Sequence, residues 1–327
     1  MVELSVLIDM ARKLAGLKWV PMWVSHLGCI KGCLNYLSLN ISNAWLFSGT
    51  GHAFILNIHK VVCPSGPTAW NTERMLKLGE ILGFTVKGVT GYKLHEDFKE
   101  KQREAFKLVR KSIDNNIPCY GWELNIPEYY VIYGYDENGY YFSGISSGYK
   151  RWWDLGVSDI GVLEVRCVKL CRPASVVKTV RDSLEFVLEF SKSPSKWVFQ
   201  DYKAGLEGYD YWINALSLGN YDKWGAAYNA AVWYECRKYA VDFLRETRLK
   251  LNVSGLIELL EEAEKYYKVV AENFRQVSLL FPFPPKRDVS KEAREKAVQN
   301  LRKARRAEGE GLKVLSEILE KLEILKV

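Results

Sequence analysis

Cys29 is the residue whose type and position best fit nucleophilic chemistry. It follows Gly28 and begins an apolar pattern that continues at Cys33, Leu34 and Leu37. This spacing predicts a helix with a buried face, running from Cys29 to Leu39. A thiol at the N-terminal end of a helix meets unpaired N–H groups and the positive end of the helix dipole, which lower its pKa and favour the thiolate. The alternative is a buried cysteine that simply packs, and position alone does not separate the two.

Two histidines are candidate partners for such a thiol. His52 lies in the segment Gly49-Thr-Gly-His-Ala-Phe54, where glycines allow close backbone approach and a histidine can face a pocket as acid, base or donor. It can equally be a structural residue that caps a turn. His26 lies three residues before Cys29 and could act as a base or line a ligand site. His26, Cys29 and Cys33 could also contribute to a metal site, but a fourth ligand at matching spacing is missing, so we predict no metal.

Carboxylates form a second group of candidates. Glu123 and Glu128 flank the segment Leu-Asn-Ile-Pro, just before an otherwise apolar strand. An acid at the entrance of a buried strand needs a partner, which can be a ligand, a cation or a donor within the protein. Glu235 lies on an aromatic helical face and either pairs with an arginine or lines a cavity. We predict that these three glutamates bind a ligand, while a structural role remains the alternative.

Composition and the remaining motifs exclude several function classes. The net charge of +7 comes from many charges of both signs, which is typical of a solvated, charge-rich surface. The abundant Lys, Glu and Arg are also typical of thermophilic proteins. No phosphate-binding glycine loop, serine-hydrolase elbow or nucleic-acid module is present. We therefore expect a small-molecule partner, with no nucleic acid and no cofactor.

The N-terminus and the cysteines bear on the compartment. Residues 1–20 carry Glu3 and Asp9 within an apolar pattern, which predicts a short amphipathic helix rather than a signal peptide. No apolar run is long enough to span a membrane. Seven cysteines, an odd number in a long chain, are not typical of a disulfide framework. Cys167 and Cys171 share a strand face but lie too far apart along it to pair. We therefore expect a cytoplasmic protein with free thiols.

The secondary-structure pattern that must position these residues changes near residue 172, where we place a domain boundary. Residues 1–172 alternate helical and extended patterns, and 173–327 are almost entirely helical. In the first part we expect helices at 72–82 and 94–115, strands at 129–135 and 161–170, and an Asn-Gly hairpin turn at 136–139. In the second part we expect helices at 176–190, 205–218, 221–247, 254–280 and 289–325. The last of these has a basic face, formed by Arg302, Lys303, Arg305 and Arg306, that is either solvated or binds an acidic partner.

Three segments of the first half resemble the family of butirosin biosynthesis protein H. They are Cys29-Ile-Lys-Gly-Cys-Leu-Asn-Tyr-Leu37, Gly49-Thr-Gly-His-Ala-Phe54 and Pro127-Glu-Tyr-Tyr-Val-Ile-Tyr-Gly-Tyr-Asp136. In the second half, Ala226-Ala-Tyr-Asn-Ala-Ala-Val-Trp-Tyr-Glu-Cys-Arg237 resembles the helical domain that follows in many of those proteins. The resemblance implies an α+β fold: a papain-like cysteine-peptidase-type domain at 1–172, followed by an all-α domain at 173–327. It also implies acyl transfer to an amine.

Carried over residue by residue, the resemblance places the family's thiol at Cys29 but not its partners. Glu128 stands where the catalytic histidine is expected, Gly144 near the orienting aspartate and Trp23 near the oxyanion-hole glutamine. A glutamate cannot replace an imidazolium here, because its negative charge raises the pKa of the thiol. A thiol without a base is a poor nucleophile.

Three hypotheses follow. The first is a protein that has lost the Cys-His-Asp triad and binds a small, amine-bearing molecule between its domains, with Cys29, His52, Glu123 and Glu128 lining the site and Glu235 closing it. The second is an acyltransferase or amidohydrolase that uses Cys29 with His52 or His26 as a displaced base. The third is a protein-interaction module that uses the helical domain.

Overall fold

The computed structural model describes residues 11–285 and 288–324, which divide into two compact units. Unit 1 comprises Met1–Asn40 and Phe84–Cys171, and unit 2 comprises Ile41–Gly83 and Arg172–Val327. The chain therefore changes unit at residues 40–41, 83–84 and 171–172. The last change coincides with the boundary expected near residue 172. Residues 41–83, however, which we expected in the first domain, belong to unit 2.

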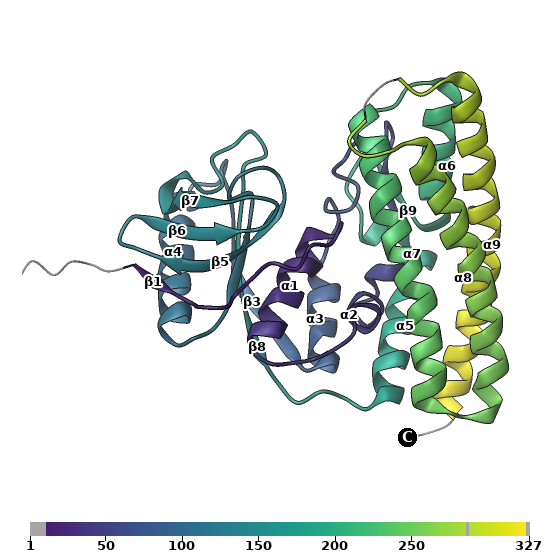
Figure 1. Ribbon diagram of the computed structural model, residues 1–327, viewed down its shortest axis with the longest axis horizontal. Helices are drawn as coiled ribbons and strands as arrows, with labels where there is room; N and C mark the ends of the chain where they lie inside the picture. The colour runs from purple at the N-terminus through teal and green to yellow at the C-terminus, as the bar shows by residue number, and fades with distance from the viewer. Residues whose placement is uncertain (1–10, 286–287, 325–327) are drawn as a thin grey trace, which may run out of the picture. The chain divides into compact units, whose positions relative to one another are not determined.

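Unit 1 is built on an antiparallel sheet in which β3, β8, β4, β5, β6 and β7 are neighbours in that order (Figure 1). The bounds are β3 (Phe84–Tyr92), β4 (Cys119–Trp122), β5 (Tyr129–Tyr135), β6 (Gly139–Ser143), β7 (Ser147–Arg151) and β8 (Val162–Leu170). A short strand, β1 (Arg12–Lys13), pairs with the end of β5. Asp136 accepts hydrogen bonds from the backbone N–H groups of Asn138 and Gly139, which confirms the predicted hairpin turn between β5 and β6.

Two helices cover opposite faces of this sheet. α1 (Ser25–Tyr36) contacts β4, β5 and β8, and α4 (Phe98–Asp114) contacts β3, β4, β5 and β8. On β4, Tyr120 contacts His26 of α1, so its neighbour Cys119 points to the other face. There Cys167, which lies opposite Cys119, contacts Ser112 of α4. The two faces of β4 and β8 therefore have different chemical environments.

The helix that carries Cys29 begins earlier than expected, at Ser25. Gly28 does not form a turn before the helix but lies inside its first turns. A Cβ at Gly28 would come within 2.5 Å of the carbonyl oxygen of Val20, and a Cβ at Gly32 within 2.1 Å of that of Lys18. These glycines therefore allow the segment before α1 to pack against the helix backbone. Cys29 consequently lies four residues inside α1 rather than at its N-terminal end.

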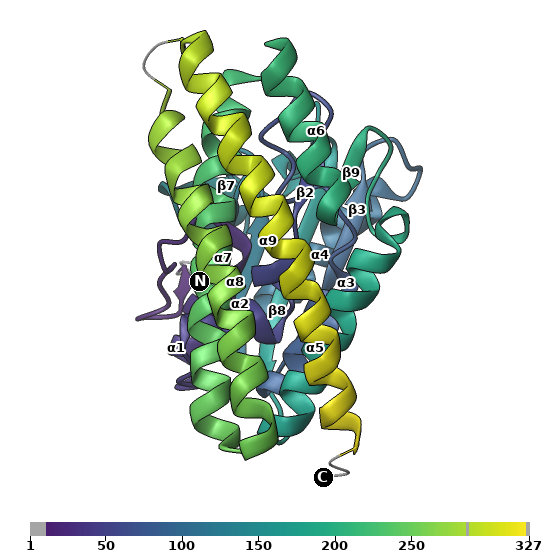
Figure 2. The ribbon, with the colours of Figure 1, turned by 90° about the vertical axis from the view of Figure 1, so that its right-hand side faces the viewer.

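Unit 2 is mostly helical. Its long helices α7 (Lys223–Leu251), α8 (Ser254–Leu280) and α9 (Lys291–Ile324) lie side by side (Figure 2). Together with α5 (Val176–Lys192) and α6 (Gly205–Leu218), they confirm the five predicted helices. The unit also contains α2 (Asn43–Gly49), the 3₁₀ helices η1 (His52–Phe54) and η3 (Pro194–Lys196), α3 (Glu73–Leu82), and the paired strands β2 (Asn57–His59) and β9 (Tyr202–Ala204). Unit 1 contains η2 (Trp152–Asp154).

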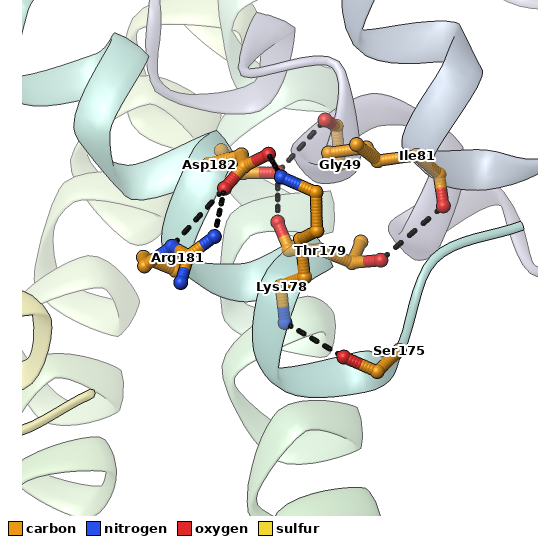
Figure 3. Close-up of polar contacts among 8 residues, drawn as sticks. Gly49, Ile81, Ser175, Lys178, Thr179, Arg181 and Asp182 are labelled. Carbon is orange, nitrogen blue, oxygen red and sulfur yellow. Dashed lines mark hydrogen bonds and ion pairs between the residues drawn. The ribbon is translucent and has the colours of Figure 1, made fainter. Parts of the chain in front are cut away.

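Side-chain hydrogen bonds hold segment 41–83 against α5 (Figure 3). The Ser183 hydroxyl donates to the carbonyl of Gly49 at 2.8 Å, and the Thr179 hydroxyl donates to the carbonyl of Ile81 at 3.3 Å. Ser175 caps the start of α5 by accepting a hydrogen bond from its third residue. Carbonyls near the ends of α2 and α3 thus find donors on α5, as buried backbone groups require.

The apolar face of α2 packs against α7 in the same unit. The rings of Phe47 and Tyr239 are 4.5 Å apart, and those of Trp45 and Phe243 are 5.1 Å apart. Leu46 and Phe47 are fully buried. This packing explains why segment 41–83 belongs to unit 2 although it lies between two parts of unit 1 in the sequence.

Of the remaining secondary-structure predictions, most are confirmed and the N-terminal helix is not. The predicted helix at 72–82 and strands at 129–135 and 161–170 are confirmed within two residues, and the helix expected at 94–115 begins at Phe98. In the N-terminal segment, residues 1–10 lie outside the described residues, and residues 11–20 contain β1 rather than a helix. The architecture is thus a mixed α and β one, with an antiparallel sheet and a C-terminal helical region. None of the described helices is long and apolar enough to span a membrane.

Candidate functional site

Ser25 and Glu128 form the polar centre of the candidate site in unit 1. The Ser25 hydroxyl, on the first residue of α1, donates a hydrogen bond to Oε2 of Glu128. The same hydroxyl oxygen accepts a hydrogen bond from the backbone N–H of Tyr129 at 3.1 Å. The start of α1 is thereby joined to the start of β5. The Glu128 carboxylate lies next to a helix N-terminus, an environment that favours negative charge.

Cys29 lies close to this pair but in a different chemical state from the one a nucleophile needs. The side chain is fully buried. Burial raises the pKa of the Cys29 thiol well above its usual value, and the nearby Cys33 and Glu128 raise it further. The expected effect of Glu128 on the thiol is therefore present. A neutral, inaccessible thiol packs as a small apolar side chain.

His26 contacts two tyrosines of the sheet. Its Nε2 lies 2.9 Å from the hydroxyl of Tyr120, and its ring stacks on that of Tyr129 with centroids 4.0 Å apart. Tyr129 also meets Trp122 edge to face, with centroids 5.0 Å apart. His26, Tyr120, Trp122 and Tyr129 are all buried. These side chains form a cluster of aromatic rings beside the Ser25–Glu128 pair.

The polar contacts continue from the tyrosines to an ion pair on β8. The Tyr129 hydroxyl donates to Glu164 at 3.3 Å, and Arg166 donates to the same carboxylate oxygen at 3.1 Å. Arg166 also donates to the hydroxyl of Thr90 at 2.8 Å. Burial, followed by the charge of Glu164, raises the pKa of Tyr120 and of Tyr129 well above the usual value. Both phenols therefore stay protonated, and that of Tyr129 donates its hydrogen bond to Glu164.

Glu123 is the first residue of the loop between β4 and β5, and Glu128 is its last. The backbone N–H of Glu123 donates to the carbonyl of Glu128 at 2.8 Å, so the two residues close the loop 123–128. Its φ is +55°, a left-handed conformation that is uncommon for a residue other than glycine. The Glu123 carboxylate accepts a hydrogen bond from the Ser158 hydroxyl at 2.7 Å. The two predicted carboxylates thus share a loop, but each is bound by a different serine.

In unit 2, His52 is buried among aromatic rings. Its ring lies 5.7 Å from that of Trp70, 6.2 Å from that of Phe47 and 6.3 Å from that of Trp233. Neither ring nitrogen has a hydrogen-bond partner among the described residues. Burial, helped by the positive charge of Arg237, lowers the pKa of His52 to about 3. The imidazole is therefore neutral at physiological pH.

The buried charge of α7 is Arg237, not the predicted Glu235. Arg237 donates to both carboxylate oxygens of Glu308, at 2.9 and 2.6 Å, and to the carbonyls of Ala53 and Ile55 at 2.8 and 2.9 Å. Tyr209 also donates to Glu308. Glu235 is only half-buried.

The aromatic stripe that we expected beside Glu235 is also partly exposed, because Trp224 is 56% accessible. The buried face of α7 lies elsewhere, along Ala226, Ala230, Trp233 and Arg237. The aromatic face around Glu235 is therefore not the main buried face of α7.

On the basic face of α9, one arginine contacts α6 and the other basic side chains are exposed. Arg305 donates to the carbonyl of Leu206 and pairs with Asp210 on α6 at 2.9 Å. Arg302, Lys303 and Arg306 are exposed.

Of the six predicted site residues, four lie in unit 1 and two in unit 2. Unit 1 contains His26, Cys29, Glu123 and Glu128, and unit 2 contains His52 and Glu235. A site that uses all six remains a prediction. Sequence reasoning missed Ser25 and Tyr120. The Ser-His pair before the apolar pattern is the signal that could have indicated Ser25, since serine is common at helix starts.

Comparisons with known proteins add no family to this picture. No protein-family model matches the sequence, and a search of curated proteins gives no match. Within the described residues, no group of three or more His, Cys, Asp or Glu side chains is arranged to hold a metal ion.

Proposed function

We propose that unit 1 binds a small, amine-bearing molecule at the Ser25–Glu128 pair, on a papain-like scaffold that does not use a Cys-His-Asp triad. The observation that carries the proposal is the hydrogen bond between Ser25 and Glu128 at the start of α1. Glu128 is the residue that, by the resemblance, stands in place of a catalytic histidine. A carboxylate is the usual partner of an ammonium group.

The surroundings of Glu128 also suit a cation. Trp122 and Tyr129 present aromatic rings in the same part of the unit, and aromatic faces attract ammonium groups. Glu123 supplies a second carboxylate at the other end of the same loop. Ile126, at the tip of that loop, is exposed. An amine with a short carbon chain could therefore contact both a carboxylate and an apolar side chain of the same loop.

Cys29 is not needed for this function. Its burial and raised pKa count against the alternative of a Cys29-dependent acyltransferase or amidohydrolase. The exposed arginines of α9 leave an acidic protein partner as a further alternative for unit 2.

Calorimetric titration of the full-length protein tests the proposal. The probes are spermidine and an aminoglycoside, each compared with its N-acetylated, uncharged counterpart. We expect binding of the amines only. We expect Glu128→Gln to weaken it about tenfold or more, because a hydrogen bond to a charged group contributes about 1.5–3 kcal/mol. Glu123→Gln should weaken binding as well.

Two controls make the result specific. Cys29→Ser should retain the wild-type affinity, and so should Glu137→Gln, which removes an exposed carboxylate in the turn between β5 and β6. Wild-type affinity in both Glu123→Gln and Glu128→Gln would refute the proposal. Equal binding of the acetylated probes would refute it too.

A further inference from the structure

Cys119 and Cys167 form a pair of thiols that the proposed function does not use. They lie directly opposite each other on β4 and β8, with their sulfur atoms 3.2 Å apart. In the adjacent residue pair, the N–H of Val168 donates to the carbonyl of Pro118. Hydrogen-bonded and non-hydrogen-bonded pairs alternate along antiparallel strands, so the two cysteines occupy a non-hydrogen-bonded pair, in which side chains come closest. The Cα atoms of such pairs are about 4.5 Å apart, a separation that a disulfide can span.

The surroundings of this pair distinguish the two sulfur atoms. Cys119 is fully buried, and Cys167 is 5% accessible. The Sγ of Cys167 lies 3.1 Å from the hydroxyl of Ser112 on α4 as well as beside the thiol of Cys119. The hydrogen bond between the two thiols lowers the pKa of Cys167 most, burial opposes this, and the hydrogen bond with Ser112 lowers it further. Burial raises the pKa of Cys119 well above its usual value. The pKa of Cys167 is therefore lower than that of Cys119.

We infer that Cys119 and Cys167 are a redox-active dithiol, which a small peroxide oxidises to a disulfide between β4 and β8. In the first step the Cys167 thiolate attacks one oxygen of hydrogen peroxide, the O–O bond breaks and hydroxide leaves, which gives a sulfenic acid. In the second step the sulfur of Cys119 attacks that of Cys167. The S–O bond breaks, and the hydroxide released takes the thiol proton and leaves as water. The hydroxide from the first step takes up the proton that Cys167 lost when it formed the thiolate, so two thiols and one peroxide become one disulfide and two waters.

The disulfide would lie on the α4 face of the sheet, opposite the α1 face that carries the candidate site. Tyr120, next to Cys119, points to the α1 face, where it contacts His26. Arg166, next to Cys167, holds Glu164 on the same strand. Oxidation would therefore fix the two strands that carry these groups, whether or not unit 1 binds an amine. The inference does not depend on the proposed function.

Counting free thiols in the full-length protein tests this inference. The protein is treated with hydrogen peroxide, unfolded and labelled with N-ethylmaleimide, and its intact mass is measured. The sequence has seven cysteines, so we expect seven labels before oxidation and 7 − 2 = 5 after it. Peptide mapping without reduction should identify the link as Cys119–Cys167. Dithiothreitol should restore all seven labels.

Single variants test the order of the two steps. In Cys119→Ser, the sulfenic acid on Cys167 has lost the thiol that lies opposite it, so dimedone should label Cys167. Cys167→Ser should keep its six remaining thiols under the same treatment. Cys63→Ser is a matched control in unit 2 and should still lose two labels.

Three results would overturn the inference, and wild-type protein alone is enough to obtain them. One is retention of all seven labels at peroxide concentrations that oxidise methionine. Another is a link that joins other cysteines, such as Cys33 to Cys167, since Cys33 lies near enough to affect both thiols. The third is a loss of labels that dithiothreitol does not reverse.

Discussion

Ser25 and Glu128, 103 positions apart in sequence, are joined by a hydrogen bond in which the serine hydroxyl donates to the carboxylate. The same serine oxygen accepts the N–H of Tyr129. One hydroxyl therefore satisfies a buried backbone donor and a carboxylate, and it connects the start of α1 to β5.

Ser25→Ala should destabilise the protein by about 1–3 kcal/mol, because it leaves the Tyr129 N–H without its acceptor and removes a donor from Glu128. Urea unfolding measures the change. Ser147→Ala, which removes an exposed hydroxyl on β7, is the control and should change stability by less than about 0.5 kcal/mol. Equal effects of the two substitutions would mean that the Ser25 contacts contribute nothing.

Cys29 should resist alkylation in the folded protein. Its thiol is buried, and its pKa is raised above the usual value by burial, Cys33 and Glu128. Iodoacetamide treatment from pH 6 to pH 9, followed by peptide mapping, should leave Cys29 unmodified while the half-buried Cys63 reacts. Unfolding in urea should make both reactive. Modification of Cys29 near pH 6 would instead favour the thiol-dependent alternative.

Arg237→Met should be among the most destabilising substitutions in unit 2. It removes the partner of the buried Glu308 and the donor to two carbonyls, and breaking a buried ion pair costs about 3–5 kcal/mol. Replacing both partners, as in Arg237→Met with Glu308→Leu, should cost less than Arg237→Met alone, because no charge is left buried. Arg275→Met breaks the exposed pair with Glu272 and should cost less than about 1 kcal/mol.

His52 should make unit 2 sensitive to acid. The folded-state pKa of about 3 lies below the usual 6.5, so protonation favours the unfolded chain as the pH falls from 6.5 toward 3. The His52 contribution is fully present above pH 6.5 and declines below it, by up to about 1.4 kcal/mol per pH unit. Urea unfolding at pH 7.5 and pH 5 should therefore show a loss of about 2 kcal/mol that His52→Phe removes.

The control for this pH dependence is His95→Gln, which changes an exposed histidine in unit 1. It should lose stability between pH 7.5 and pH 5 as the wild type does. A wild-type loss that survives in His52→Phe would assign the acid sensitivity to other groups.

The sequence predicted elements with strong local patterns well. The Asn-Gly turn between β5 and β6 and the start and end of α6 and α8 follow from periodicity and turn chemistry. β3 was missed because Gly88 and Gly91 weaken its strand pattern, although Gly88 is required where the strand passes close to the carbonyl of Val165. α2 was missed because it is only seven residues long.

The candidate site was only partly predictable, for a different reason. A carboxylate before an apolar strand is unusual, so the sequence indicates Glu128, but its partner Ser25 lies 103 positions away. Contacts of this kind depend on how α1 packs on β5. Glu235 and Arg237 show the same limit on α7, since a pattern gives the helix but tertiary packing selects the face that is buried.

Unit 2 is formed by two separate parts of the chain, so the position of a cut determines which of its helices each fragment carries. A break between Cys171 and Arg172 leaves α2 and α3 on the first fragment, while the long helices are on the second. Expressed alone, the first fragment would present Leu46, Phe47 and Ile58 to water, and its insolubility would say little about unit 1. Expressed together, the two fragments would reassemble through α2, α3 and α5, as in a split-protein complementation system.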